Sequence, residues 1–381
     1  MTTELPQRAI PYFWDQYARK YRVLLKNGQS PASVLGEAGF RMGLWAANQI
    51  GWTLDDLLEP AWRDVRLEGP IFILGHQRSG TTFLHRLLIE DALCGENGAV
   101  GMTMAQMVLP SFTMRRGLDA LIAPVKERIL AWEDQKMQRL DDIHYGRFHL
   151  IGEDEVALWS IFASAMCAND SPISSYARGL EPLRRVEDWP IGSQRAVMRW
   201  YRSCLMKAIR DAGQDEGIFV SKNPAFTKRI DLLLAEFPEA KFVYLIRNPL
   251  ETIPSRLSLI EAIWQSRFPE FETLEPEHVQ AIVADSRRIY LEGEEGLKGI
   301  PSERLFVLPY KELIADPGGR TRELLEHFGF EASPGLDDAL RRREANRIMG
   351  KKNRRYGLGD YGLCEEDIRR DLAPVFARYG F

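Results

Sequence analysis

The chain has 381 residues, of which 45% are hydrophobic and 10% aromatic, so it can bury a large core and is not disordered along most of its length. Its net charge of −4 argues against a general nucleic-acid binder, whose basic surplus would show. The four cysteines lie far apart without metal-ligand spacing, and the N-terminus is too charged for a signal peptide. We therefore expect reduced thiols, no metal site, no transmembrane segment and a cytoplasmic location.

Residues 1–62 predict an aromatic-rich helical segment that packs on the remainder of the chain. We interpret residues 63–381 as a single domain. Aromatic residues of this kind usually close a core. Contact with a membrane, or with a second copy in a homodimer, is the alternative that the sequence leaves open.

Four short apolar runs have the composition of buried strands, because each is too short for a helix and is bounded by turn residues. Helical spacing lies between them, for example over 226–237, and follows the last of them near 320–328. This alternation predicts an α/β fold, a P-loop-like and mostly parallel sheet flanked by helices. Ligands of such sheets bind beyond the carboxyl ends of the strands. The runs are 71–74, 218–220, 241–246 and 305–308.

The stretch from about 95 to 215 lacks strand signals and predicts a helical insertion on the acceptor side. Apolar residues follow helical spacing over 129–143 and again over 156–166. The segment 102–114 is rich in methionine, and flexible thioethers suit an adaptable apolar pocket, although core packing explains them equally well.

The loop after the first strand has the spacing of a phosphate-binding loop, Gly-x4-Gly, between Gly75 and Gly80. Glycines at both ends let the backbone turn so that successive N–H groups face an anion at the start of a helix. The lysine that nucleoside triphosphates require is replaced by Thr81. A 5′-phosphosulfate carries less charge at its transferred end, and Arg78, Thr82 and the backbone can neutralise it.

Two segments resemble the sulfotransferases that use 3′-phosphoadenosine-5′-phosphosulfate (PAPS), in particular a branch found largely in bacteria. Residues 73–88 are similar to the loop that binds the 5′-phosphosulfate, and residues 242–255 to the motif that grips the 3′-phosphate. The resemblance assigns the 3′-phosphate to Arg247 and Ser255. It also implies that a basic loop near the C-terminus closes over this phosphate.

The resemblance thus implies PAPS as donor, 3′-phosphoadenosine-5′-phosphate (PAP) as product and a binding set drawn from three segments. These residues are Gly75, Gln77, Arg78, Ser79, Gly80, Thr81, Thr82, Arg247, Ser255, Lys351, Arg354 and Arg355.

Sulfuryl transfer needs cations near the departing phosphate and a base for the acceptor proton. Arg78 and Lys222 are our candidates for the cations. Related enzymes often carry a histidine shortly after the lysine, but Phe226 stands there, and Gln106 cannot act as a base. The remaining candidates for the base are Glu96, His144, Glu153 and Glu155.

The sequence favours a sulfotransferase that acts on a hydroxyl of a small, lipophilic acceptor, a class that includes lipid-like alcohols. One rival is a P-loop nucleotide kinase or NTPase, which would need a lysine in place of Thr81 and an acidic Mg²⁺ ligand at a strand end. The other is a PAP-binding module without catalysis, which Phe226 makes conceivable.

Overall fold

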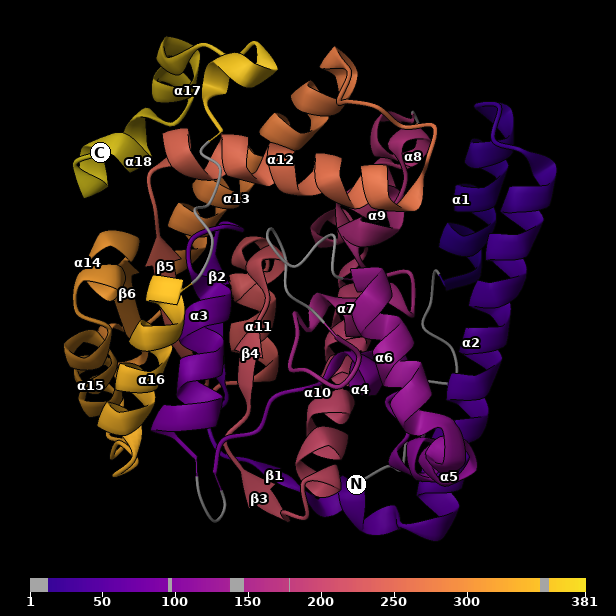
Figure 1. The fold of residues 1–381 in the computed structure, drawn as a ribbon, viewed down its shortest axis with the longest axis horizontal. Helices are drawn as coiled ribbons and strands as arrows, with labels where there is room; N and C mark the ends of the chain where they lie inside the picture. The colour runs from indigo at the N-terminus through magenta and orange to yellow at the C-terminus, as the bar shows by residue number, and fades with distance from the viewer. Residues whose placement is uncertain (1–12, 95–97, 138–146, 178, 350–355) are drawn as a thin grey trace. The chain divides into compact units, whose positions relative to one another are not determined.

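A computed structural model describes residues 13–94, 98–137, 147–177, 179–349 and 356–381 (Figure 1). The chain divides into two compact units. The first comprises Met1–Leu67, Met102–Met137 and Gly146–Gly217, and the second Glu68–Gly101, Gln138–Tyr145 and Ile218–Phe381. Among the described residues, no helix combines the length and the apolar character that crossing a membrane requires.

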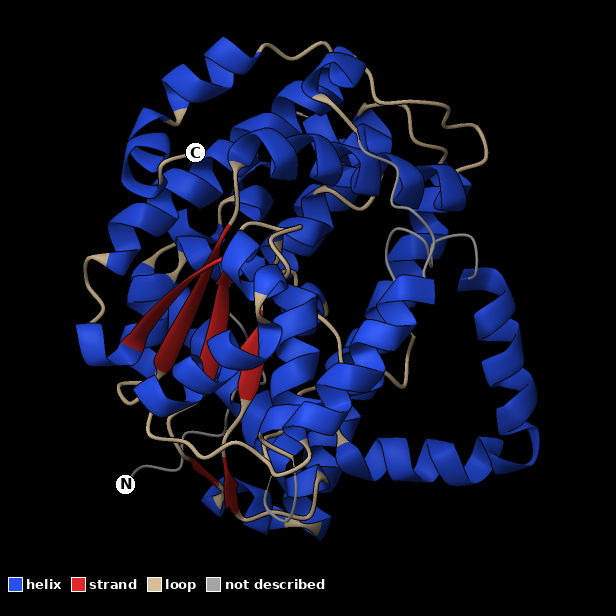
Figure 2. Ribbon diagram, turned by 60° about the vertical axis from the view of Figure 1, so that its left-hand side comes forward, coloured by secondary structure: helices blue, strands red, loops and turns tan. Residues whose placement is uncertain are grey.

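The second unit is built on a four-stranded parallel sheet with the strand order β4-β2-β5-β6. Figure 2 shows these strands side by side, with helices around them. The register places Ile73 beside Lys222 on one side and beside Val243 on the other. The strands are β2 (Ile71–Gly75), β4 (Val220–Lys222), β5 (Lys241–Ile246) and β6 (Leu305–Pro309).

The two central strands, β2 and β5, are apolar because helices cover both faces of the sheet. Every residue of β2 is buried. Beside β6, the helices α14 to α16 gather at one edge (Figure 1). The helices of this unit are α3 (Thr81–Arg86), α11 (Ile230–Glu236), α12 (Pro249–Arg267), α13 (Pro276–Leu297), α14 (Tyr310–Ala315), α15 (Pro317–His327), α16 (Leu336–Met349), α17 (Glu365–Asp371) and α18 (Ala373–Tyr379). Its short turns are the π-helical η2 (Leu87–Ala92) and the 3-10 helices η6 (Pro224–Lys228), η7 (Ser302–Arg304) and η8 (Leu358–Tyr361).

The first unit is helical apart from one short parallel pair, β1 (Arg66–Leu67) with β3 (Glu216–Gly217). Its core includes a buried ion pair of Lys207 with Asp55, surrounded by the rings of Trp52 and Trp62. The helices are α1 (Phe13–Lys26), α2 (Pro31–Leu58), α4 (Met104–Val108), α5 (Phe112–Ile122), α6 (Lys126–Met137), α7 (Glu155–Trp159), α8 (Pro172–Tyr176), α9 (Glu181–Arg184) and α10 (Ile191–Asp211). The described residues of this unit also form the 3-10 helices η1 (Pro60–Asp64), η3 (Ala123–Val125), η4 (Ala165–Ala168) and η5 (Val186–Asp188).

Three predicted elements differ from the structure. The strand expected at 218–220 is β4, shifted to Val220–Lys222, and Phe219 instead forms a bridge with Val100. The helix expected over 226–237 begins only at Ile230, because a 3-10 turn precedes it. The helical spacing over 156–166 is interrupted after α7, where Phe162 adopts a φ of 56°, which a right-handed helix cannot accommodate.

Candidate functional site

The loop between β2 and α3 depends on two glycines for its path. Gly75 has a φ of 124°, and a Cβ there would lie 2.1 Å from the carbonyl oxygen of Leu245 on the neighbouring strand. Gly80 has a φ of 87°, and its Cβ would lie 2.8 Å from the ring of Tyr310. Side chains at these positions would force the loop away from β5 and α14.

Thr227 holds the start of this loop from the η6 turn. Its hydroxyl accepts from the Gly75 N–H at 2.8 Å and lies 3.2 Å from the Gly75 carbonyl oxygen, to which it donates. Within the loop, the N–H of Ser79 donates to the carbonyl of His76 at 3.2 Å. The loop is therefore fixed from within and from η6.

Arg78 is the strained residue of the loop, because it adopts a φ of 69° although it is not glycine. Its Nε donates to Oγ of Ser255 at 3.0 Å. Ser255 lies on α12, so this bond joins the loop to the segment that follows β5. Burial and the nearby Arg247 lower the pKa of the Arg78 guanidinium below its ordinary value.

Arg247 extends from the carboxyl end of β5 toward the same loop. Its Nη1 donates to the Arg78 carbonyl at 2.8 Å, and its Nη2 pairs with Glu251 at 2.8 Å. The guanidinium lies 4.2 Å from the ring centroid of Tyr310. Two arginines that repel each other in this way create a local positive field suited to an anion.

Ser79 gives a second indication of an anion at this loop. Its side chain is fully buried, and among the described residues no hydrogen-bond partner is found for its Oγ. A buried hydroxyl without a partner is costly unless a ligand supplies one. Together with the two glycines and the two arginines, this hydroxyl fits a phosphate or sulfate group.

Lys222 lies at the carboxyl end of β4, beside β2, and is buried. Burial first, and then the charge of Lys222, lower the pKa of His85 on α3 to about 3. Lys222 is therefore close to the helix that follows the loop. Phe226 is a core residue whose ring makes an edge contact with Phe72 of β2, so this position supplies no base.

Two of the acidic candidates for the base, Glu153 and Glu155, lie in the first unit, at the start of α7. Glu155 is buried and Glu153 is half-buried, while Asp154 between them accepts a hydrogen bond from the Tyr201 hydroxyl. Gln106 is structural, since it closes the capping box of α4.

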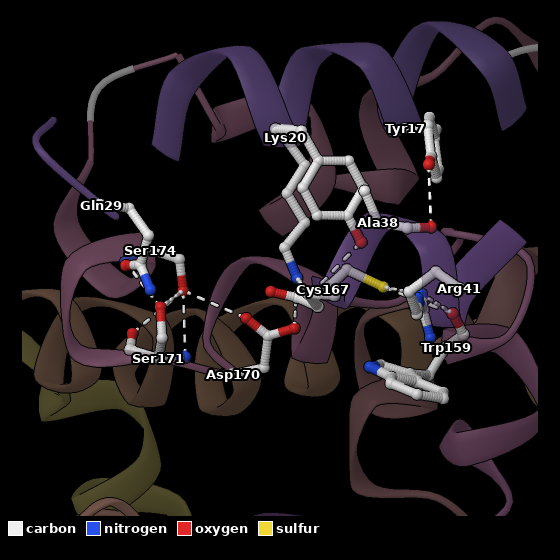
Figure 3. A network of polar contacts seen from close by, with 12 residues as sticks. Tyr17, Lys20, Gln29, Ala38, Arg41, Trp159, Cys167, Asp170, Ser171 and Ser174 are labelled. Carbon is white, nitrogen blue, oxygen red and sulfur yellow. Dashed lines mark hydrogen bonds and ion pairs between the residues drawn. The ribbon is translucent and has the colours of Figure 1, made fainter. Parts of the chain in front are cut away.

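The segment after α7 is fixed by a polar network on α1 and α2 (Figure 3). Lys20 pairs with Glu37 at 2.7 Å and with Asp170. Arg41 donates to the Trp159 carbonyl, and its guanidinium lies 3.5 Å from the ring centroid of that residue. Glu153 and Glu155 therefore precede a segment that is held in place by buried charged side chains.

Five predicted site residues lie outside the described residues. They are Glu96, His144, Lys351, Arg354 and Arg355.

Sequence reasoning missed the part that α13 plays beneath the site. Its Asp285 pairs with Lys228 at 2.8 Å and with Arg256, the residue after Ser255. Burial by itself would raise the pKa of Asp285, but the two cations outweigh burial and hold this pKa well below its ordinary value. No local signal in the sequence marks these pairs, because the partners come from three separate elements.

Comparison with known proteins identifies the relatives of this chain. Residues 70–334 match the family model described as the sulfotransferase family. Two curated relatives, from Mycobacterium bovis and Mycobacterium tuberculosis, are named omega-hydroxy-beta-dihydromenaquinone-9 sulfotransferase. Each is 29% identical over 349 residues, which cover 89% of this chain and 80% of the relative.

Two crystal structures share the fold. A sulfotransferase from Mycobacterium tuberculosis has a TM-score of 0.67 at 23% identity, covering 96% of this chain and 94% of that chain. A sulfotransferase from Mycobacterium avium has a TM-score of 0.68 at 19% identity, covering 100% of this chain and 98% of that one. The predicted α/β fold is thereby confirmed.

Proposed function

Since the chain belongs to the sulfotransferase family, we propose that it transfers a sulfuryl group from PAPS to a hydroxyl of a small lipophilic acceptor, releasing PAP. The observation that carries the donor is the bond from Arg247 Nη1 to the Arg78 carbonyl, 2.8 Å long, between residues 169 positions apart. It brings the two segments expected to bind the 5′- and 3′-groups of PAPS into direct contact.

We assign the 5′-phosphosulfate to the loop and the 3′-phosphate to Arg247 and Ser255. The backbone of the loop, Thr82 and the buried Ser79 hydroxyl would hold the phosphosulfate oxygens. The forked guanidinium of Arg247 suits a phosphate with two parallel hydrogen bonds.

In the proposed reaction the acceptor oxygen forms a bond to sulfur while the bond from sulfur to the bridging oxygen breaks. The electron pair of the broken bond stays on the 5′-phosphate of PAP. Arg78 and Lys222 would stabilise the negative charge that develops on this oxygen. The acceptor proton passes to a base, for which Glu153, Glu155, Glu96 and His144 are our candidates.

The lipophilic acceptor is supported by the relatives. Their name assigns to them a hydroxylated menaquinone derivative, a lipid with a terminal hydroxyl. We infer a similar class of acceptor for this chain, an alcohol on a long apolar body. The cytoplasmic location and the homodimer stay predictions.

The donor is tested by thermal unfolding with nucleotides. We expect PAP to raise the melting temperature without any metal ion, because Thr81 replaces the lysine that triphosphates need. ATP with Mg²⁺ should have little effect. Stabilisation by ATP with Mg²⁺ and none by PAP would overturn the proposed donor and favour the kinase or NTPase.

The acceptor is tested with radiolabelled PAPS and a matched pair of lipids. An ω-hydroxylated polyprenyl quinone should take up the label, and the same quinone without the terminal hydroxyl, which has no other hydroxyl to accept the group, should not. Label on a free sugar instead would refute the lipophilic acceptor and leave the donor standing. Binding of PAP with no turnover on a broad panel of alcohols would favour the inactive module.

A further inference from the structure

We propose that Tyr290 of α13 is a positioning residue that aligns Arg247 for the 3′-phosphate of the donor. The inference rests on the proposed donor, PAPS. Tyr290 lies outside both sequence motifs, and it contacts a residue of each, Arg247 and His76.

The Tyr290 hydroxyl holds the backbone from which Arg247 extends. It is fully buried and donates to the Arg247 carbonyl at 2.9 Å. The hydroxyl of Thr252 lies 2.6 Å from the Tyr290 hydroxyl oxygen. Because a phenol carries a single proton, Thr252 donates to Tyr290 while Tyr290 donates to Arg247. The proton order is therefore fixed by the geometry.

The ring of Tyr290 contacts the loop between β2 and α3. It stacks on His76, with ring centroids 4.9 Å apart and planes inclined by 6°. His76 directly follows Gly75, and its Nδ1 donates to the Gln77 carbonyl at 2.6 Å. One side chain thus touches both segments of the proposed site, with the hydroxyl on one and the ring on the other.

The helix that carries Tyr290 cannot easily shift. One turn before it, Asp285 pairs with Lys228 and Arg256. One turn after it, a Cβ on Gly293 would lie 2.6 Å from Cγ2 of Thr227, so the helix lies against η6 as closely as glycine allows. Since α13 is held on both sides, the position of the Tyr290 hydroxyl is set by the helix.

Tyr290→Phe removes the hydroxyl contact to Arg247 but keeps the ring contact to His76, so it separates the two contacts. Removing the hydroxyl leaves the Arg247 carbonyl without this donor and frees the peptide that orients the guanidinium. The phenyl ring retains its stack on His76 and so preserves the loop between β2 and α3, which we propose binds the 5′-phosphosulfate. If Tyr290 served only the fold, losing its hydroxyl would weaken binding at both the 5′- and the 3′-phosphate positions, or at neither.

The test compares Tyr290→Phe with the wild-type chain by isothermal titration of PAP and of 5′-AMP, which lacks the 3′-phosphate. We expect the affinity for PAP to fall about 10-fold, the equivalent of one hydrogen bond, and that for 5′-AMP to change less than about 2-fold. Tyr379→Phe is the matched control, since its hydroxyl donates to Glu294 of α13, the helix that carries Tyr290, at 2.8 Å and neither residue belongs to the two motifs, so that it should change neither affinity.

Equal losses for the two nucleotides in a folded Tyr290→Phe variant, or no loss, would overturn the inference and leave the proposed donor intact. Should Tyr290→Phe fail to fold, Thr252→Val removes the hydroxyl behind Tyr290. It should lower the PAP affinity selectively by about 3-fold, and an unchanged ratio would reject the inference. A wild-type chain that does not prefer PAP to 5′-AMP would refute both the donor and the inference.

Discussion

Two arginines dominate the candidate site at the scale of single residues. Arg78 sits in a left-handed conformation that costs roughly 1–2 kcal/mol for a residue other than glycine. Its Nε bond to Ser255 and the Arg247 bond to its carbonyl hold it there. The strain is thus retained by contacts to the segment proposed to grip the 3′-phosphate.

Arg247→Ala should weaken the binding free energy of PAP by about 2–4 kcal/mol, because it leaves a partly buried phosphate without its charged partner. The affinity for 5′-AMP should fall far less, and calorimetric titration of the two nucleotides measures the difference. Arg320→Ala is a suitable control, since this arginine pairs with Glu312 and Glu323 outside the loops. Equal weakening of the two nucleotides would show that Arg247 serves the fold alone.

Arg78 can be tested by comparing two small replacements. Both Arg78→Gly and Arg78→Ala should abolish most turnover, because both lose the guanidinium. Glycine tolerates the positive φ, so Arg78→Gly should be the more stable of the two by about 1 kcal/mol in urea unfolding. A more stable alanine variant would show that the loop relaxes out of the left-handed conformation.

At the scale of elements, β2, its loop and α3 carry two histidines that the fold keeps uncharged. Burial above all lowers the pKa of His76 and of His85 to about 3. The nearby Arg256 adds to this effect at His76, and Lys222 at His85. Neutral imidazoles avoid adding positive charge beneath a loop that already holds Arg78.

The two histidines predict a loss of stability in mild acid. The unfolded chain takes up their protons below an ordinary pKa of about 6.5, and the folded chain does so only near 3, so stability falls as the pH drops between these values. At pH 5 each should cost about 2 kcal/mol relative to pH 7. Urea unfolding at both pH values measures the sum, and His85→Gln should remove half of the difference. If the difference in unfolding free energy between pH 7 and pH 5 were unchanged in that variant, His85 would not be one of the groups responsible.

At the scale of the whole molecule, the candidate residues are distributed over the two compact units. The segments proposed to bind the donor belong to the unit with the parallel sheet, and Glu153 and Glu155 belong to the helical unit. Each unit has its own buried charges, which fix the segments that carry these residues.

If an acid of the α7 segment is the base, Glu155→Gln or Glu153→Gln should lower turnover roughly 10²–10⁴-fold while PAP affinity stays unchanged. The rate should be measured on an aliphatic alcohol, because a phenolic proton is already acidic and needs less help. Glu181→Gln, another glutamate of this unit, is the control. Near-normal rates in both variants would leave Glu96 and His144 as the remaining candidates.

The sequence by itself determined the parallel sheet and the loop after its first strand. Strands β2 and β5 can be recognised as apolar runs in the sequence because both of their faces are buried. The loop can be recognised from its glycine spacing because φ is a local property of the backbone. It misplaced β4, whose Ser221 and Lys222 are polar although buried.

Only the tertiary structure decided which side chains meet. The bond of Arg78 to Ser255 spans 177 positions and that of Tyr290 to Arg247 spans 43, and neither leaves a local pattern. The break at Phe162 is of the same kind, because its ring packs against Phe13 and Tyr17 of α1. Local sequence encodes burial and backbone preference, whereas the pairing of distant polar groups follows from how the elements pack.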